Sequence, residues 1–193
     1  MSETAIAGYD YGRVGPSPVG KDDLEALKAA VLFGPEDEAA LRRAGEVLGD
    51  QVEAILDVWY AFVGANPQLV AAFAGPEGEP VTTYLDRVRP RFGQWIKDTC
   101  LRPYDEAWLA YQEEIAERHT PAKKNKTDHA PSIDHVPLRY LIALISPITS
   151  TVRDFLARGD RPAAEVDAMH EAWRKAVILQ VALWARPYAP QLW

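Results

Sequence analysis

The sequence predicts an all-α protein, and three observations support this prediction. Apolar residues recur at helical spacing, most clearly at Val52, Ile55, Leu56, Trp59 and Val63, which follow the i, i+3, i+4, i+7 pattern of one helix face. No segment of useful length alternates apolar and polar residues, and no Asn-Gly or Asp-Gly pair marks a hairpin. No repeat of about 20–50 residues is present, which favours a packed bundle over a solenoid.

Proline, glycine and capping residues divide the chain into about eight expected helices. Residues 1–20 are rich in glycine and proline and are expected to form an irregular N-terminal arm, docked through Tyr9 and Tyr11, whereas residues 21–193 are expected to form one domain. Helices are expected over residues 22–31, 36–47, 52–65, 67–73, 83–101, 105–118, 137–157 and 163–184. Pro90 is expected to kink its helix or mark an irregular first turn, and Pro147 is expected to interrupt another.

Composition and charge exclude several classes of protein. Hydrophobic residues make up 48% of the 193 residues and charged residues 25%, which is ordinary for a globular protein. The net charge of −7 gives no reason to expect a nucleic-acid partner. The basic cluster Lys123, Lys124 and Lys126 is interpreted as a solvated loop. We expect no membrane span, because no apolar run approaches about 20 residues, and no secretory signal, so a cytoplasmic location is expected.

The motifs of well-known enzyme classes do not occur in the sequence. Cys100 is the only cysteine, so neither an intrachain disulfide nor a cysteine zinc cluster can form, and a C-x-x-C-H haem attachment site is missing. The chain also has no P-loop, no Gly-rich dinucleotide fingerprint, no H-E-x-x-H pair and no G-x-S-x-G elbow. Whether the protein is an enzyme is left open by the motifs.

His119 differs from the other three histidines in its position. It follows Ile115 by four residues on the apolar side of an expected helix and precedes a proline-containing loop. A neutral imidazole there could ligate a metal through one nitrogen while its other N–H meets a backbone carbonyl. Spacing alone favours the other interpretation, a core or capping histidine. His129, His135 and His170 are interpreted as exposed or structural.

Trp59 and Tyr60 place two aromatic side chains with polar tips near the middle of an apolar helix. Neighbouring residues diverge by about 100° around a helix, so both can line one cavity only where it faces the boundary between them. An ordinary aromatic core is the alternative. A buried phenol or indole needs a hydrogen-bond partner, which a bound ligand can supply.

Several segments in a shared order resemble the protoglobins, a branch of the globin superfamily. They run from Gly8 to Tyr188 and read GYDYG, AGEVL-DQVEAILDVWYAFVG, YLDRVRPRFGQWI-DTC, WLAYQ-EI--RH, KKN-TD, RYLIALI-PIT and LQVALWARPY. The resemblance implies a globin fold with an extra N-terminal helix and an N-terminal arm. It also implies haem b, bound without a covalent link between the helices called E and F in globins.

The resemblance also assigns residues to the haem site. His119 matches the proximal iron ligand, Trp59 and Tyr60 match residues over the distal face, and Phe92 matches the distal-side phenylalanine. Less firmly matched residues are Leu85 and Val88, as lining of the tunnels that admit small ligands. Arg91 lies near this face and could pair with a haem propionate, or it could be a surface arginine.

The chain departs from the common protoglobin pattern at four positions, one of which is Pro90, an unusual residue for the distal helix. Thr120 stands where a second histidine often follows the first, and Leu144 and Ser146 stand where aromatic residues are frequent. The last two substitutions suggest a wider pocket or access route. The family tends to form homodimers through its last two long helices, so a homodimer is expected here.

Three classes of function follow from these expectations. The leading one is reversible binding of the diatomic gases O₂, CO and NO at an open distal iron site, with Tyr60 or Trp59 as a possible hydrogen-bond donor to O₂. The second is a haem-dependent enzyme acting on NO, peroxide or other small reactants. A gas sensor that signals through a separate partner is a variant of the first class. The third class is a helical bundle that binds no haem.

Overall fold

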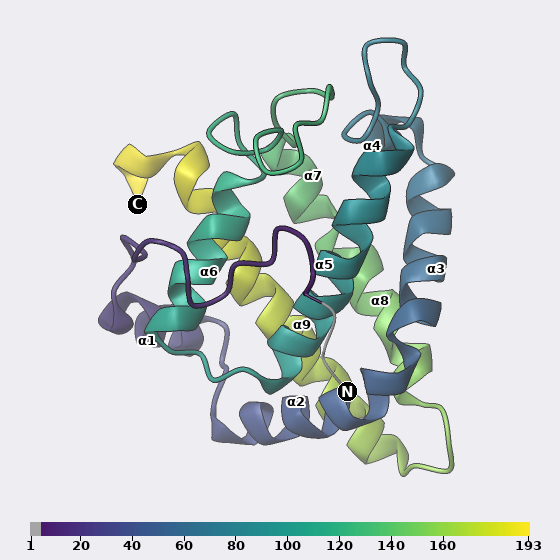
Figure 1. Ribbon diagram of the computed structural model, residues 1–193. Helices are drawn as coiled ribbons and strands as arrows, with labels where there is room; N and C mark the ends of the chain where they lie inside the picture. The colour runs from purple at the N-terminus through teal and green to yellow at the C-terminus, as the bar shows by residue number, and fades with distance from the viewer. Residues whose placement is uncertain (1–4) are drawn as a thin grey trace.

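The computed structural model describes residues 5–193, so the first four residues of the expected arm lie outside the described residues. Helices form the fold (Figure 1), with one isolated bridge between Ala74 and Pro80 and no strand in the described part. The α-helices are α1 (Lys21–Ala30), α2 (Pro35–Leu48), α3 (Val52–Gly64), α4 (Pro67–Val70), α5 (Thr82–Leu101), α6 (Glu106–Glu117), α7 (Leu138–Ala143), α8 (Ile145–Leu156) and α9 (Ala163–Ala185). The all-α prediction is confirmed.

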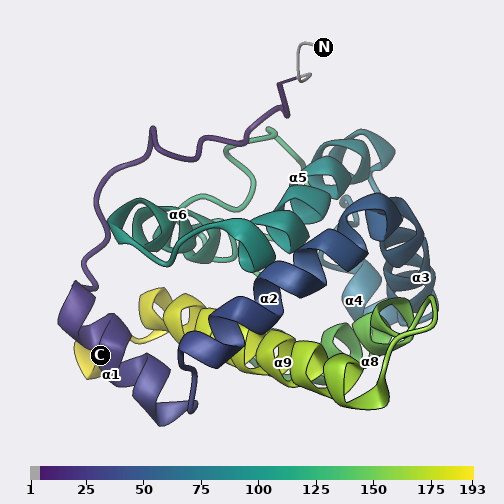
Figure 2. The same ribbon diagram turned by 90° about the horizontal axis from the view of Figure 1, so that it is seen from below.

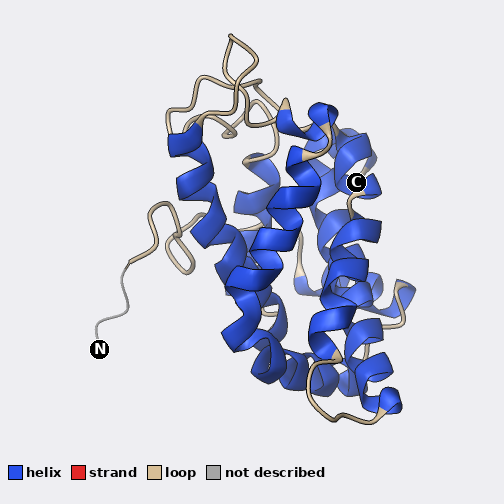
Figure 3. Ribbon diagram, turned by 90° about the vertical axis from the view of Figure 1, so that its right-hand side faces the viewer, coloured by secondary structure: helices blue, strands red, loops and turns tan. Residues whose placement is uncertain are grey.

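Helix α9 lies at the centre of the packing. It contacts α2, α6 and α8, and residues along its whole length are buried, including Met169, Trp173 and Leu179. Figure 2 shows α5 and α6 on one side of the molecule and α8 and α9 on the other. Helix α2 crosses one end, and the loops before α5 and after α6 cover the opposite end (Figures 1 and 3).

Local capping hydrogen bonds mark the start of α1, α2 and α6. The Asp105 carboxylate accepts a hydrogen bond from the Trp108 amide at 2.9 Å and begins α6, as expected of an N-cap aspartate. Helix α1 begins at Lys21, one residue before the expected start of this helix. Gly20 is the capping residue, and its amide donates to the Asp23 side chain at 3.1 Å.

The two prolines that fall inside expected helices have different effects. The break predicted at Pro147 lies at Leu144, between α7 and α8. Pro147 has no N–H to donate to the Ala143 carbonyl and its ring crowds that carbonyl, which favours a break at this point. Pro90, by contrast, lies inside α5, which is continuous through it, so Pro90 does not mark an irregular first turn.

The described part of the N-terminal arm is docked across α5 and α6 (Figure 1). The Tyr9 hydroxyl donates to the buried Asp98 carboxylate at 2.6 Å, and the Arg118 guanidinium donates to the Gly8 carbonyl at 2.6 Å. Gly8 has a φ of +73°, and a Cβ at this position would lie 2.6 Å from the Arg91 guanidinium. Glycine is therefore required where the arm passes closest to α5.

The crossing of α2 over α5 also depends on a glycine. A Cβ on Gly45 would lie 2.9 Å from the Cβ of Cys100, so a larger residue would push the helices apart. We expect Gly45→Val to lower the free energy of unfolding by about 2 kcal/mol through overpacking, measured by urea denaturation. Gly64→Ala is the control, because no atom lies within 4 Å of its added Cβ. An unchanged midpoint for Gly45→Val would show that α2 and α5 can separate at no cost.

Candidate functional site

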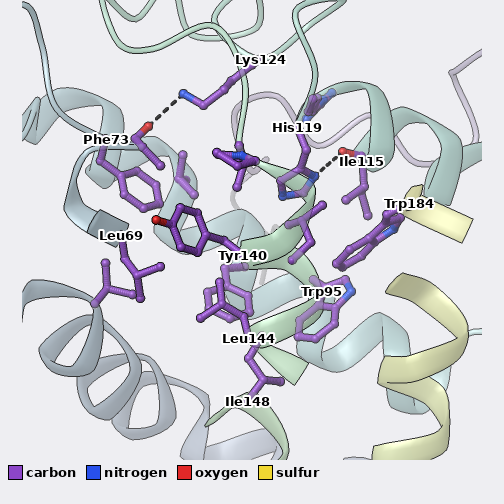
Figure 4. A pocket seen from close by; sticks show the side chains of 18 of the residues that line it. Leu69, Phe73, Trp95, Ile115, His119, Lys124, Tyr140, Leu144, Ile148 and Trp184 are labelled. Carbon is purple, nitrogen blue, oxygen red and sulfur yellow. Dashed lines mark hydrogen bonds between the residues drawn. The ribbon is translucent and has the colours of Figure 1, made fainter. Parts of the chain in front are cut away.

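A cavity of about 500 Å³ lies between α3, α5, α6, α8 and α9 and under the loops that follow α4 and α6. This volume is typical of sites that bury a small molecule or cofactor. Its walls are mainly aromatic and aliphatic side chains, with a few polar groups. Figure 4 shows the imidazole of His119 and the ring of Tyr140 both directed into the cavity.

His119 lies two residues beyond the end of α6, where its amide donates to the Ala116 carbonyl at 3.0 Å in a turn. Its Nδ1 lies 2.8 Å from the Ile115 carbonyl oxygen, and because a carbonyl can only accept, Nδ1 carries the proton. Nε2 makes no hydrogen bond to the described residues. This nitrogen is therefore available as a ligand inside the cavity.

The His119 imidazole is held in its neutral form. Burial lowers its pKa to about 4, with a further lowering by the charge of Lys124 and an opposing effect of the Ile115 carbonyl. A neutral imidazole protonated at Nδ1 presents a lone pair at Nε2, which is the form that binds a metal ion.

The cavity brings six of the seven predicted site residues together. His119, Trp59, Tyr60, Val88, Arg91 and Phe92 all line it. Trp59 and Phe92 contact each other edge to face, with ring centroids 5.6 Å apart. Leu85 is not among the lining residues and is half-buried on α5.

Tyr60 and Trp59 each offer a polar tip for which the described residues supply no hydrogen-bond partner. Burial raises the pKa of Tyr60 to about 12, while the charges of Arg89 and Arg91 oppose this effect. The phenol therefore keeps its proton at neutral pH and can donate a hydrogen bond. Leu144 also lines the cavity, whereas Ser146 is exposed, so only the first of these substitutions can widen the pocket.

One end of the cavity is cationic. Arg91 donates to the Asp128 carboxylate and to the Ala7 carbonyl, each at 3.0 Å from Nη1, and its side chain is only 12% exposed. Arg91 is therefore not a surface arginine. Arg118 lines the same cavity and donates to Glu114 Oε1 at 2.9 Å.

Lys124 corrects the interpretation of the basic cluster as a solvated loop. The residue is 4% exposed, and its ammonium donates to the Ala72 carbonyl at 2.8 Å and to the Ser132 hydroxyl at 2.7 Å. It also lies 5.3 Å from the Tyr84 ring centroid. Burial lowers its pKa to about 8, with Asp134 opposing this shift.

The lowered pKa of Lys124 predicts a rise in stability at alkaline pH. Above pH 8 the folded state loses the Lys124 proton, while the unfolded chain keeps it until about pH 10.4. Folding therefore releases a proton in this pH range, and a higher pH favours the folded state. We expect the free energy of unfolding to rise by about 2 kcal/mol between pH 7 and 9.5 relative to Lys124→Met. Urea denaturation at both pH values and equal haem content measures the difference. Parallel pH profiles of the two proteins would contradict the prediction.

Sequence reasoning missed several cavity residues because they come from distant elements. Tyr84, Lys124, Tyr140 and Trp184 all line the cavity. Tyr140 and Trp184 stand in the quoted segments RYLIALI and LQVALWARPY, which were the only sign of their importance in the sequence. Nothing local in KKN-TD indicated that one of its lysines is buried.

The cavity suits haem by the chemistry of its walls. A flat apolar macrocycle fits among aromatic and aliphatic side chains, an unpartnered Nε2 on His119 can supply one axial ligand, and Arg91 and Arg118 lie where carboxylates could pair. The fold and the site thus define the class of all-α globin-like, haem-binding proteins.

The comparison with known families identifies the branch. Residues 20–193 match the family model described as Protoglobin, so the chain belongs to the protoglobin family, whose members are globin-type haem proteins that bind gas. A search of curated proteins found no match. None of the described helices has both the length and the apolar character needed to cross a membrane. The assignment of α1 as an addition to the globin core stays a prediction.

Proposed function

We propose that this protein binds O₂, CO and NO reversibly on haem b, with His119 as the axial protein ligand and the opposite side of the iron open. The observation that carries the proposal is the Nε2 atom of a neutral, half-buried imidazole, facing a large apolar cavity without a partner among the described residues. When bound, haem supplies an iron atom that can coordinate a diatomic gas.

Different residues of the chain have different proposed roles at this site. The Ile115 carbonyl fixes the protonated nitrogen of His119 and so aims the other nitrogen into the cavity. Tyr60 or Trp59 donates a hydrogen bond to the gas, which favours O₂ over CO because bound O₂ carries more negative charge. Phe92, packed against Trp59, limits the space beside the gas.

Further residues are proposed to hold the haem edge and to admit ligands. The Arg91 guanidinium has five N–H donors, so it can pair with a propionate while keeping Asp128. Val88 lines the cavity and is proposed as a wall of an access tunnel. The same role for Leu85 rests on the family resemblance alone.

We propose the following assembly on the resemblance to protoglobins. An arm of residues 1–20 precedes one globin domain of residues 21–193. Two copies associate through α8 and α9 into a homodimer, in the cytoplasm. Haem b is held without a covalent link, since the one cysteine, Cys100, is not among the residues that line the cavity. Light scattering during gel filtration measures the assembly.

Visible absorption tests the proposed function most directly. The purified protein should take up one haem per chain, and a pyridine haemochrome spectrum should identify it as haem b. The ferrous protein should then give distinct, reversible spectra with O₂, CO and NO. A protein that stays colourless after incubation with haem, or whose sixth position is filled by a side chain that CO cannot displace, would contradict the proposal.

A further inference from the structure

We propose that Trp184 and Tyr188, at the C-terminal end of α9 and the turn after it, are positioning residues that hold His119 in its ligating orientation. We call this pair the C-terminal clamp. The inference rests on the proposed function in that it takes His119 as the haem ligand. The two residues fix the plane of the imidazole, which helix α6 alone does not fix.

His119 needs an outside restraint because α6 ends before it. The helix stops at Glu117, and the His119 amide makes only a turn hydrogen bond to Ala116. The hydrogen bond from Nδ1 to the Ile115 carbonyl fixes one atom of the ring. The plane of the imidazole can still turn about the Cβ–Cγ bond over the range of angles that this hydrogen bond tolerates, unless something lies against its face.

Trp184 supplies that face. Its indole stacks on the imidazole at a small angle, with centroids 5.5 Å apart and planes inclined by 25° to each other, and Figure 4 shows both rings in the cavity wall. The indole N–H donates to the Gln112 side-chain oxygen at 2.9 Å. Gln112 is 2% exposed and lies on α6 two turns before His119. The indole is therefore fixed to the same helix that carries the ligand.

Tyr188 restrains the backbone of the same residue. The His119 carbonyl accepts from the Val136 amide at 2.8 Å, and the Tyr188 hydroxyl lies 3.0 Å from the same carbonyl. The hydroxyl lies closer to the Val136 carbonyl, and its single proton can be donated to only one of the two, so Tyr188 restrains His119 either directly or through Val136. The C-terminal clamp thus holds the ring of His119 through Trp184 and its carbonyl through Tyr188.

The C-terminal clamp is proposed to set the orientation of the His119 ring, an effect that core packing alone would not have. A ring held in one plane would present its Nε2 atom to a bound haem iron from one direction only. A ring that rotates samples several geometries and binds the iron less tightly. We therefore expect loss of the clamp to change the iron–histidine bond even in molecules that are folded and fully loaded with haem.

The first test replaces the histidine by a free ligand. In His119→Gly, added imidazole should fill the vacated position and bind the haem iron. Trp184→Leu in this background should weaken imidazole binding by roughly 2- to 12-fold, the value of one aromatic stacking contact. Trp108→Phe is the control, because this buried tryptophan does not line the cavity and its indole N–H has no hydrogen-bond partner in the described residues. Equal imidazole affinity with and without Trp184 would overturn the proposal.

The second test keeps His119 and reads the bond itself. Trp184→Phe keeps an aromatic face but loses the hydrogen bond to Gln112, and Tyr188→Phe removes the hydroxyl that lies between the His119 and Val136 carbonyls. Each should shift or broaden the iron–histidine stretching band of the ferrous protein in resonance Raman spectra, at unchanged haem content. Bands identical to that of the unchanged protein in both variants would overturn the clamp. A parent protein without any histidine-ligated haem would instead refute the proposed function.

Discussion

His119→Ala is expected to lower the affinity of the protein for haem by at least about 100-fold, because loss even of groups that only support a metal ligand typically costs 10- to 100-fold. A 100-fold loss corresponds to about 2.7 kcal/mol, and this part of the stabilisation by haem should disappear. Haem titration followed by visible absorption measures the affinity, and thermal unfolding with and without haem measures the linked stability.

Two other histidines provide matched controls for this substitution. His129 and His135 are both exposed and do not line the cavity. His129→Ala and His135→Ala should therefore keep the haem spectrum of the unchanged protein. If His119→Ala retains a histidine-ligated spectrum while one of the controls loses it, the assignment of the axial ligand is wrong.

Tyr60→Phe is expected to raise the O₂ dissociation rate by roughly 10- to 100-fold and to change CO dissociation little. The expected factor is that of one hydrogen bond to a partly charged acceptor, about 1.5–3 kcal/mol. The burial that raises the pKa of Tyr60 to about 12 keeps the phenol protonated, so it can donate. Stopped-flow mixing and flash photolysis measure the two rates.

Trp59→Phe tells the two proposed donors apart. If the Trp59 indole donates instead, this substitution and not Tyr60→Phe should raise the O₂ dissociation rate. Tyr104→Phe is the control, because Tyr104 does not line the cavity and donates to the Thr99 carbonyl at 2.9 Å. An O₂ dissociation rate unchanged in Tyr60→Phe would reject Tyr60 as the donor.

The parts of the fold that depend on neighbouring residues were predictable from the sequence. The apolar spacing from Val52 to Val63 predicted α3 almost to the residue, and Asp105 marked the start of α6. The break before α8 was placed too late because proline acts on the carbonyl four residues earlier. Its effect therefore falls at Leu144 rather than at Pro147 itself.

The parts that depend on long-range packing were not predictable from local pattern. Lys124 can be buried because its ammonium donates hydrogen bonds to the Ala72 carbonyl and the Ser132 hydroxyl, which come from two different loops. Leu85 and Val88 stand three residues apart on α5, yet only Val88 lines the cavity, because the rotation of a helix is set by all of its neighbours. The stacking of Trp184 on His119 joins α9 to the end of α6. No spacing of residues along the chain predicts this contact.

The docked arm implies an order of assembly during synthesis. Its contacts join Ala7 to Arg91, Tyr9 to Asp98 and Gly8 to Arg118, so the ribosome makes the arm long before it makes the partners. Closing such long loops is entropically costly until the helices are in place. We therefore expect the arm to be the last segment to settle, which leaves the arginine-lined side of the cavity uncovered while the cofactor enters.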